Sequence, residues 1–175
     1  MSIKNICPVC GAGHLTRQSV VEKITYKGIT ERYEHVFSLC DVCLVDQVDA
    51  EEMRLNKRAV IRLKKVIDGL LPGDEMKAIR KAWCITQDEA SLVFGGGPKA
   101  FSKYETDDVA QSESMDKLIR TAAKFPQVFS DLCIAAGVKP AVKKTTSLRI
   151  QHSIFTWSGS GEIMTAQPDV VENVH

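Results

Sequence analysis

The strongest constraint on the fold comes from two pairs of cysteines near the start of the sequence. Cys7 and Cys10 form one C-x2-C pair, and Cys40 and Cys43 form a second pair after twenty-nine intervening residues. Each pair can aim two thiolates at one ion, and four thiolates complete the tetrahedral shell of a structural Zn²⁺ without leaving an open position. Four unrelated thiols would rarely fall into two such pairs. We therefore expect these cysteines to bind one zinc ion and to close residues 1–48 into a zinc-binding module.

The residues between the two cysteine pairs are predicted to form a β-hairpin. Residues 19–26 and 29–39 are rich in Val, Ile, Thr, Tyr and Phe, and Lys27-Gly28 separates them as a turn. A module of this size buries little apolar area, so the metal is expected to supply much of its folding energy. His14 and His35 also lie in this stretch. Because four cysteines already complete the shell, we expect both histidines at the surface or beside the ligands.

Composition and charge indicate the cellular compartment and the kind of protein. The chain has 175 residues, 44% of them hydrophobic, and a net charge of +1, which fits one folded domain or two small ones. So small a net charge gives no global basic field, and any nucleic-acid binding must come from a local patch. No apolar run approaches the roughly 20 residues of a membrane span, and the opening stretch MSIKNICPVC lacks the apolar core of a signal peptide. We therefore expect a cytoplasmic protein with reduced cysteines, which favours metal binding over disulfides.

A second informative stretch is TQDEASLVFGGGPKAFSKYE, residues 86–105. Thr86 and Glu89 form a capping box, in which each side chain satisfies an unpaired backbone N–H at the start of a helix. The glycines at 95–97 are expected to end this helix, because they are free to adopt positive φ. Pro98 is expected to open a second short helix, since proline suits the first helical position. Two short helices joined by a glycine turn predict a helix-turn-helix, with a plain αα-hairpin as the alternative.

The second helix of this motif has outward side chains that suit DNA. The five predicted DNA contacts are Gln87, Gly97, Lys99, Ser102 and Lys103. Lys99 and Lys103 lie one turn apart on the same face, and lysine donates well to guanine O6 and N7, so guanines are expected in each half-site. Gly97 lets the backbone approach a phosphate, and Gln87, first in its helix, is placed to hold the neighbouring phosphate. The alternative is that both lysines only neutralise phosphates.

A long helix is predicted between these two parts, over residues 49–73. Asp49 and Glu52 make a capping-box-like start, and Leu71-Pro72 is expected to end the helix. One face has apolar residues at a helical period, and the other is rich in Lys and Arg. We expect the basic face either to be solvated or to contact phosphates.

Three more helices complete a five-helix domain over residues 74–137, which is expected to be lambda-repressor-like. Their predicted starts are Asp74 and Ser114 as caps and Pro126 at a first helical position. Cys84 and Cys133 stand at apolar positions and are expected to be small buried residues. The whole chain is therefore predicted to be α+β, with a small zinc-bound β-hairpin module followed by an all-α helix-turn-helix domain.

The C-terminal extension, residues 138–175, has weaker signals. Residues 148–157 contain strand-forming residues in partial alternation, and residues 158–161 could turn the chain back. This segment fits a hairpin, an intersubunit strand or a segment that orders on a partner. Residues 169–175 are predicted to be disordered.

The cysteine module joined to the stretch TQDEASLVFGGGPKAFSKYE resembles the MqsA (YgiT-type) antitoxin family of bacterial type II toxin–antitoxin systems. The resemblance covers about residues 5–136 and is carried by TQ-x-EA-x(3)-FGGG-x(2)-AFS-[RK]-YE. It implies a dimeric repressor in the bacterial cytoplasm, whose zinc domain neutralises a toxin and whose C-terminal domain binds operator DNA. Lys99 and Lys103 stand where family members carry base-contacting Asn and Arg, so the family's operator sequence does not carry over.

These observations favour a DNA-binding repressor that is also an antitoxin. A zinc-containing regulator of a prophage or metabolic gene, with no toxin partner, is the alternative. We expect no enzyme, because no Ser–His–Asp-like constellation, phosphate loop or carboxylate pair stands out and a four-thiolate zinc has no open position. The partners expected are double-stranded operator DNA, a second copy of the chain and a protein toxin. The faces of residues 114–125 and 126–136 are the expected dimer interface.

Overall fold

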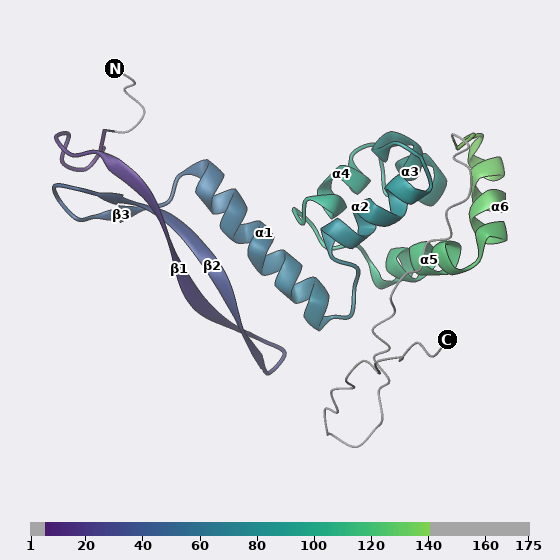
Figure 1. The fold of residues 1–175 in the computed structure, drawn as a ribbon, viewed down its shortest axis with the longest axis horizontal. Helices are drawn as coiled ribbons and strands as arrows, with labels where there is room; N and C mark the ends of the chain where they lie inside the picture. Colours follow the sequence, from purple (N-terminus) through teal and green to yellow (C-terminus); the bar gives the residue numbers. More distant parts are fainter. Residues whose placement is uncertain (1–5, 141–175) are drawn as a thin grey trace, which may run out of the picture. The chain divides into compact units, whose positions relative to one another are not determined.

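The computed structural model describes residues 6–140, which form an α+β fold as predicted (Figure 1). A three-stranded antiparallel sheet in the order β1-β2-β3 precedes the helices. The strands are β1 (Leu15–Tyr26), β2 (Ile29–Cys40) and β3 (Asp46–Gln47), and the helices are α1 (Ala50–Ile67), α2 (Gly73–Ala82), α3 (Gln87–Phe94), α4 (Ala100–Glu105), α5 (Glu113–Lys124) and α6 (Pro126–Ala136). Within residues 6–140 no helix is long and apolar enough to cross a membrane. The predictions for residues 141–175 lie outside the described residues.

The predicted hairpin and its turn are confirmed. Lys27 and Gly28 both have positive φ, at 49° and 80°, as the tightest hairpin turns require. Pairing runs from Tyr26 opposite Ile29 to Leu15 opposite Cys40. The first strand therefore begins four residues before the predicted residue 19, and the hairpin returns the chain to the second cysteine pair.

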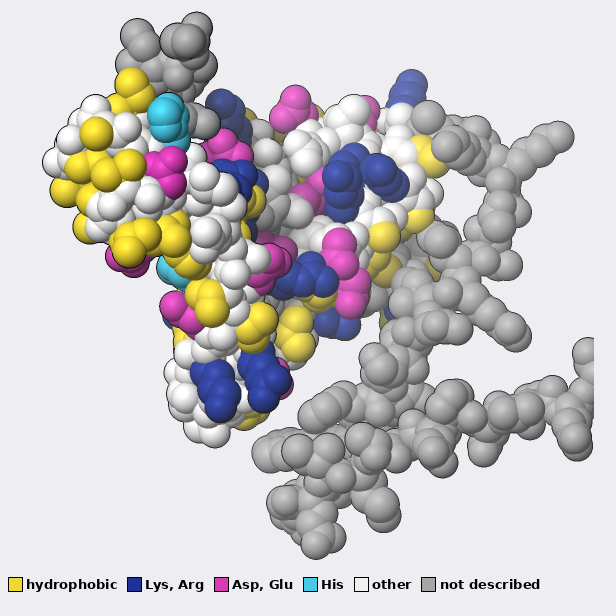
Figure 2. Space-filling view, turned by 60° about the vertical axis from the view of Figure 1, so that its left-hand side comes forward, with side chains coloured by type: hydrophobic (Ala, Val, Ile, Leu, Met, Phe, Trp, Pro, Cys, Tyr) yellow, Lys and Arg dark blue, Asp and Glu magenta, His cyan; other side chains and the backbone are white. Residues whose placement is uncertain are grey.

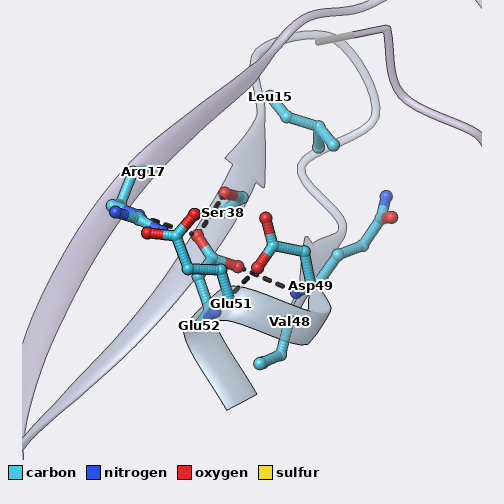
Figure 3. A pocket seen from close by; sticks show the side chains of 8 residues that line it. Leu15, Arg17, Ser38, Val48, Asp49, Glu51 and Glu52 are labelled. Atoms are coloured by element: carbon cyan, nitrogen blue, oxygen red, sulfur yellow. Dashed lines mark hydrogen bonds and ion pairs between the residues drawn. The ribbon is translucent and has the colours of Figure 1, made fainter. Parts of the chain in front are cut away.

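Helix α1 is joined to the sheet by buried hydrogen bonds around Glu52. Glu52 and Asp49 form the predicted capping box, and Ser38 Oγ on β2 donates to Glu52 Oε1 at 2.6 Å (Figure 3). Arg17 on β1 donates to the same oxygen at 3.3 Å. Burial raises the pKa of Glu52, but these hydrogen bonds outweigh it and the net pKa is lowered. One carboxylate thus connects β1, β2 and the start of α1.

The end of α1 differs from the prediction. The helix stops at Ile67, four residues before Leu71. Gly69 adopts a left-handed φ of 70°, its N–H donates to Val66 O, and the N–H of Leu70 donates to Lys65 O. This is a Schellman motif, in which a left-handed glycine satisfies the last helical carbonyls. The glycine therefore ends the helix before the proline can.

The basic face of α1 was expected to be solvated or to contact phosphates; this is wrong for Lys65, whereas Arg58 and Arg62 stay partly exposed while they pair with acidic residues. Arg58, Arg62 and Lys65 pair with Asp108, Asp74 and Asp107 in turn. Lys65 is fully buried. The sequence shows the charges of one helix, whereas these partners lie beyond it in the chain and become neighbours only on folding.

The five predicted helices α2 to α6 surround one apolar core. Met76, Phe101 and Ile119 are buried almost completely, at 1%, 1% and 0% exposure. Trp83 stacks on Phe129 with ring centroids 4.5 Å apart. Cys133 is buried in this core as expected, whereas Cys84 is only half-buried and has a left-handed φ of 55°. The expectation for Cys84 is therefore wrong.

Three predicted helix starts are displaced. The Ser112 hydroxyl, not Ser114, accepts the N–H of Met115 and caps α5. Helix α2 has Pro72 at its N-cap and no side-chain cap, so Asp74 lies in the first turn. Pro98 lies in a turn, and α4 begins two residues later, at Ala100. At α5 two nearby serines suited the cap, whereas α2 and α4 begin without a side-chain cap.

The cap of α5 provides a direct test. Replacing Ser112 by Ala should lower the free energy of unfolding by about 1 kcal/mol, because it removes the acceptor for a helical N–H. Replacing Ser114 by Ala is the matched control and should change it by less than about 0.5 kcal/mol. Urea unfolding followed by circular dichroism measures both. A larger loss for Ser114→Ala would contradict the observed cap.

Candidate metal centre and nucleic-acid interface

The structure brings all four predicted zinc ligands together. The Sγ atoms of Cys7, Cys10, Cys40 and Cys43 lie within 4.8 Å of one another. Cys7 Sγ lies 3.7 Å from Cys43 Sγ, and Cys10 Sγ lies 3.7 Å from Cys40 Sγ. A tetrahedron of thiolates about 2.3 Å from a zinc ion has S–S edges of about 3.8 Å. The donor set and its spacing therefore fit a four-thiolate metal ion.

Two tight turns, here called the knuckles, hold the cysteines in place. In the first knuckle (residues 7–13) the N–H of Cys7 donates to Gly13 O, and in the second (residues 40–45) the N–H of Leu44 donates to Cys40 O. A Cβ at Gly13 would collide with Cys40 Sγ. Position 13 must therefore be glycine for the two knuckles to close on each other.

Backbone N–H groups, neighbouring thiols and burial shift the pKa values of the cysteines in the cluster. Those of Ala12 and Gly13 lower the pKa of Cys10 to about 6, and the N–H of Cys10 lowers the pKa of Cys7. At Cys43 the N–H of Val45 lowers the pKa, but the neighbouring thiol of Cys40 and burial outweigh it and raise the pKa to about 12. The first knuckle thus favours thiolates, the form that binds metal.

The residues around the cluster were only partly predicted. His14 is exposed and lies near Asp41, and His35 lies near Glu22, so both are outside the cluster as expected. Gln47 was missed: its Nε2 donates to Cys7 Sγ at 3.4 Å. Gln47 belongs to β3, and no periodicity in so short a strand could have indicated it.

The knuckles also carry an exposed apolar surface. Its members are Val9, Val42 and Leu44, together with Ile6 directly before the first knuckle; all are exposed, with Leu44 at 71%. Figure 2 shows apolar side chains gathered over this end of the sheet. An exposed group of this kind is typical of a protein–protein contact.

Both predicted lysines of the recognition helix are exposed, but only Lys103 lies within α4, and Lys99 is its N-cap. Lys99 and Lys103 are exposed and Ser102 is half-buried, whereas Ala100 and Phe101 face the core. The two lysines line a shallow hollow of about 450 Å³, together with Gly96, Gly97, Pro98, Ala100, Tyr104 and Val109. Gly97 has a φ of 91° and is exposed. The hollow is thus lined by two lysines and by the exposed glycine turn.

The side chain of Gln87 is bound to another residue of the helix-turn-helix. Its Nε2 donates to Glu105 Oε2 at 2.8 Å. Arg80 on α2 donates to both oxygens of the same carboxylate and to Ile85 O. The predicted phosphate contact would therefore use the second amide hydrogen of Gln87 or require its release from Glu105. Sequence reasoning missed Arg80 and Glu105 because they are far apart in the chain.

Comparison with known proteins identifies related sequences. The family described as the antitoxin component of bacterial toxin-antitoxin system, MqsA, matches residues 5–133. "Antitoxin MqsA" of Escherichia coli (strain K12) is 27% identical over 130 residues, which cover 72% of this chain and 98% of that relative. The matched range includes both cysteine pairs and residues 86–105.

The metal centre provides a second test. The purified chain should contain close to one equivalent of zinc, and Cys40→Ser should lose it and unfold the hairpin, because the small sheet depends on the metal. Cys84→Ser is the matched control, since Cys84 lies outside the cluster, and should retain the metal. Elemental analysis with amide hydrogen exchange of residues 15–40 measures both effects. A metal-free wild-type chain with a protected hairpin would refute the site.

Proposed function

The chain belongs to the MqsA family, the antitoxin component of bacterial toxin–antitoxin systems, and on this premise we propose that it represses transcription by binding operator DNA and neutralises a protein toxin. In this proposal residues 1–48 are the toxin-binding zinc module, 49–73 the connection, 74–137 the DNA-binding domain and 138–175 a C-terminal extension. The observation that carries it is the presence of two surfaces of different chemistry: an apolar one on the knuckles and a basic one on α4.

The metal proposed for the four thiolates is Zn²⁺. Four thiolates at tetrahedral spacing suit zinc, and a closed shell gives the ion a structural role. It would hold the two knuckles together and so present their apolar side chains on a rigid base. Burying exposed apolar area such as Leu44 against a toxin would contribute to affinity, and rigid presentation reduces the entropy cost of binding.

The DNA-binding role is proposed for α4 and the start of α3. Lys99 and Lys103 would enter the major groove, while Ser102, Gly97 and Gln87 would contact the backbone. A single helix of this length makes few contacts, so we propose a homodimer that places two copies about one DNA turn apart. Exposed Phe125 and Ile134, at the start and end of α6, support α5 and α6 as the interface.

Co-purification with the product of the adjoining open reading frame tests the toxin role. Leu44→Asp should weaken that complex by roughly tenfold or more, because it places a charge in an apolar contact. Leu92→Asp is the matched control: Leu92 is also exposed, at 68%, but lies on α3, and the change should alter affinity by less than about twofold. Calorimetric titration measures both. If the wild-type chain binds no such product, the regulator without a toxin partner becomes the better account.

Substitution of the α4 lysines tests base reading. Lys103→Ala should cost about 1–3 kcal/mol on operator DNA and far less on random DNA, and Lys99→Ala is measured beside it. A lysine that only binds phosphate should weaken both equally and lower the salt slope by about one unit. Lys23→Ala, exposed on β1 and outside the proposed DNA and dimer surfaces, is the control and should leave both affinities unchanged. Equal losses on both DNAs for both α4 variants would overturn the assignment.

A further inference from the structure

The recognition helix ends against a buried lysine from another part of the chain. Lys65 on α1 is fully buried, and its Nζ donates to the carbonyl oxygen of Tyr104 at 2.8 Å and to Asp107 Oδ1 at 2.7 Å. Tyr104 belongs to the last turn of α4. A cation at this end of a helix is favoured, because the last carbonyls carry partial negative charge.

Asp107 connects this lysine to the start of α2. Its Oδ1 also accepts the N–H of Gly73 at 3.0 Å, and Asp107 itself adopts a left-handed φ of 56°. A Cβ at Gly73 would collide with the carbonyl oxygen of Glu105, the last residue of α4. Lys65 and Asp107 therefore join α1, the start of α2 and the C-terminal end of the recognition helix.

Two further arginines of α1 bind the same loop. Arg58 donates to both oxygens of Asp108, at 2.7 and 2.9 Å. This contact lowers the pKa of Asp108 to about 2. Arg62 Nη1 lies 3.7 Å from Asp107 Oδ2. These pairs are more exposed than Lys65, so they are expected to support the contact and the buried lysine to dominate it.

We propose that Lys65 is a positioning residue for DNA reading: it anchors the C-terminal end of α4 to α1. This inference rests on the proposed role of α4 in binding operator DNA. Helix α4 has only six residues and few hydrogen bonds of its own, so its angle depends on what holds its ends. Without Lys65 its lysines would sample more orientations, and operator binding would have to order them.

Lys65 cannot act by touching DNA, and this separates it from a phosphate contact. Its side chain has no exposed area, so it releases no counterion when DNA binds. Its loss should therefore weaken operator binding without changing the salt dependence. Lys57, exposed on the same helix, is the matched control, because its replacement removes the same charge.

The test compares Lys65→Met and Lys57→Met in the full, zinc-loaded chain. Lys65→Met should weaken operator binding about tenfold at unchanged salt slope and speed amide hydrogen exchange of residues 100–106 about tenfold, because a hydrogen-bonded charge is lost. Lys57→Met should leave the exchange within about twofold of the wild type. Exchange at wild-type rates in Lys65→Met would overturn the inference.

The exchange measurement is independent of DNA. If the wild-type chain binds no operator, the proposed function fails, but faster exchange in Lys65→Met would still show that Lys65 holds α4. If Lys65→Met does not fold, Lys65→Met/Asp107→Asn removes the uncompensated carboxylate while Asn Oδ1 still accepts the N–H of Gly73. That variant should fold and keep the faster exchange; wild-type exchange rates would again contradict the inference.

Discussion

The ion pair between Arg80 and Glu105 sets the geometry on which the proposed DNA surface depends. The Glu105 side chain is 1% exposed and that of Arg80 12%, and Gln87 donates to the same carboxylate. These residues lie on α2, at the end of α4 and at the start of α3, so one carboxylate fixes three helices relative to one another. Removing one partner of such a pair leaves an uncompensated buried charge, which costs about 3–5 kcal/mol. The two helices of the helix-turn-helix are thus held by polar contacts as well as by the aromatic core.

The sheet end of the chain is organised differently. Almost all of β1 is exposed, with Leu15, Ile24 and Tyr26 only half-buried. Residues 6–47, the described part of this end, form no core comparable with the one around Phe101. Order there comes from the long hairpin, the hydrogen bonds of Glu52 and the four thiolates. In our account a metal ion replaces the missing apolar core, which leaves the apolar side chains of the knuckles free to face a partner.

Local chemistry predicted much of the fold. The cysteine spacing, the Lys27-Gly28 turn and the capping boxes at Asp49 and Thr86 each depend on residues a few positions apart, and the structure confirms the turn and both boxes. The α5 cap was misplaced because Ser112 and Ser114 have the same chemistry. Nothing local marked Lys65 as buried, since its partners Tyr104 and Asp107 lie about forty residues away. The DNA contacts of Lys99 and Lys103 stay predictions.

The central claim is that α4 presents a surface that reads a specific DNA sequence. The most direct measurement is a competition experiment at fixed salt between DNA from upstream of the gene and random-sequence DNA of equal length, with the zinc-loaded chain. The account predicts at least about a thousandfold tighter binding to the upstream DNA, which is the usual margin of sequence-specific over non-specific binding. Equal affinity for the two DNAs would contradict it.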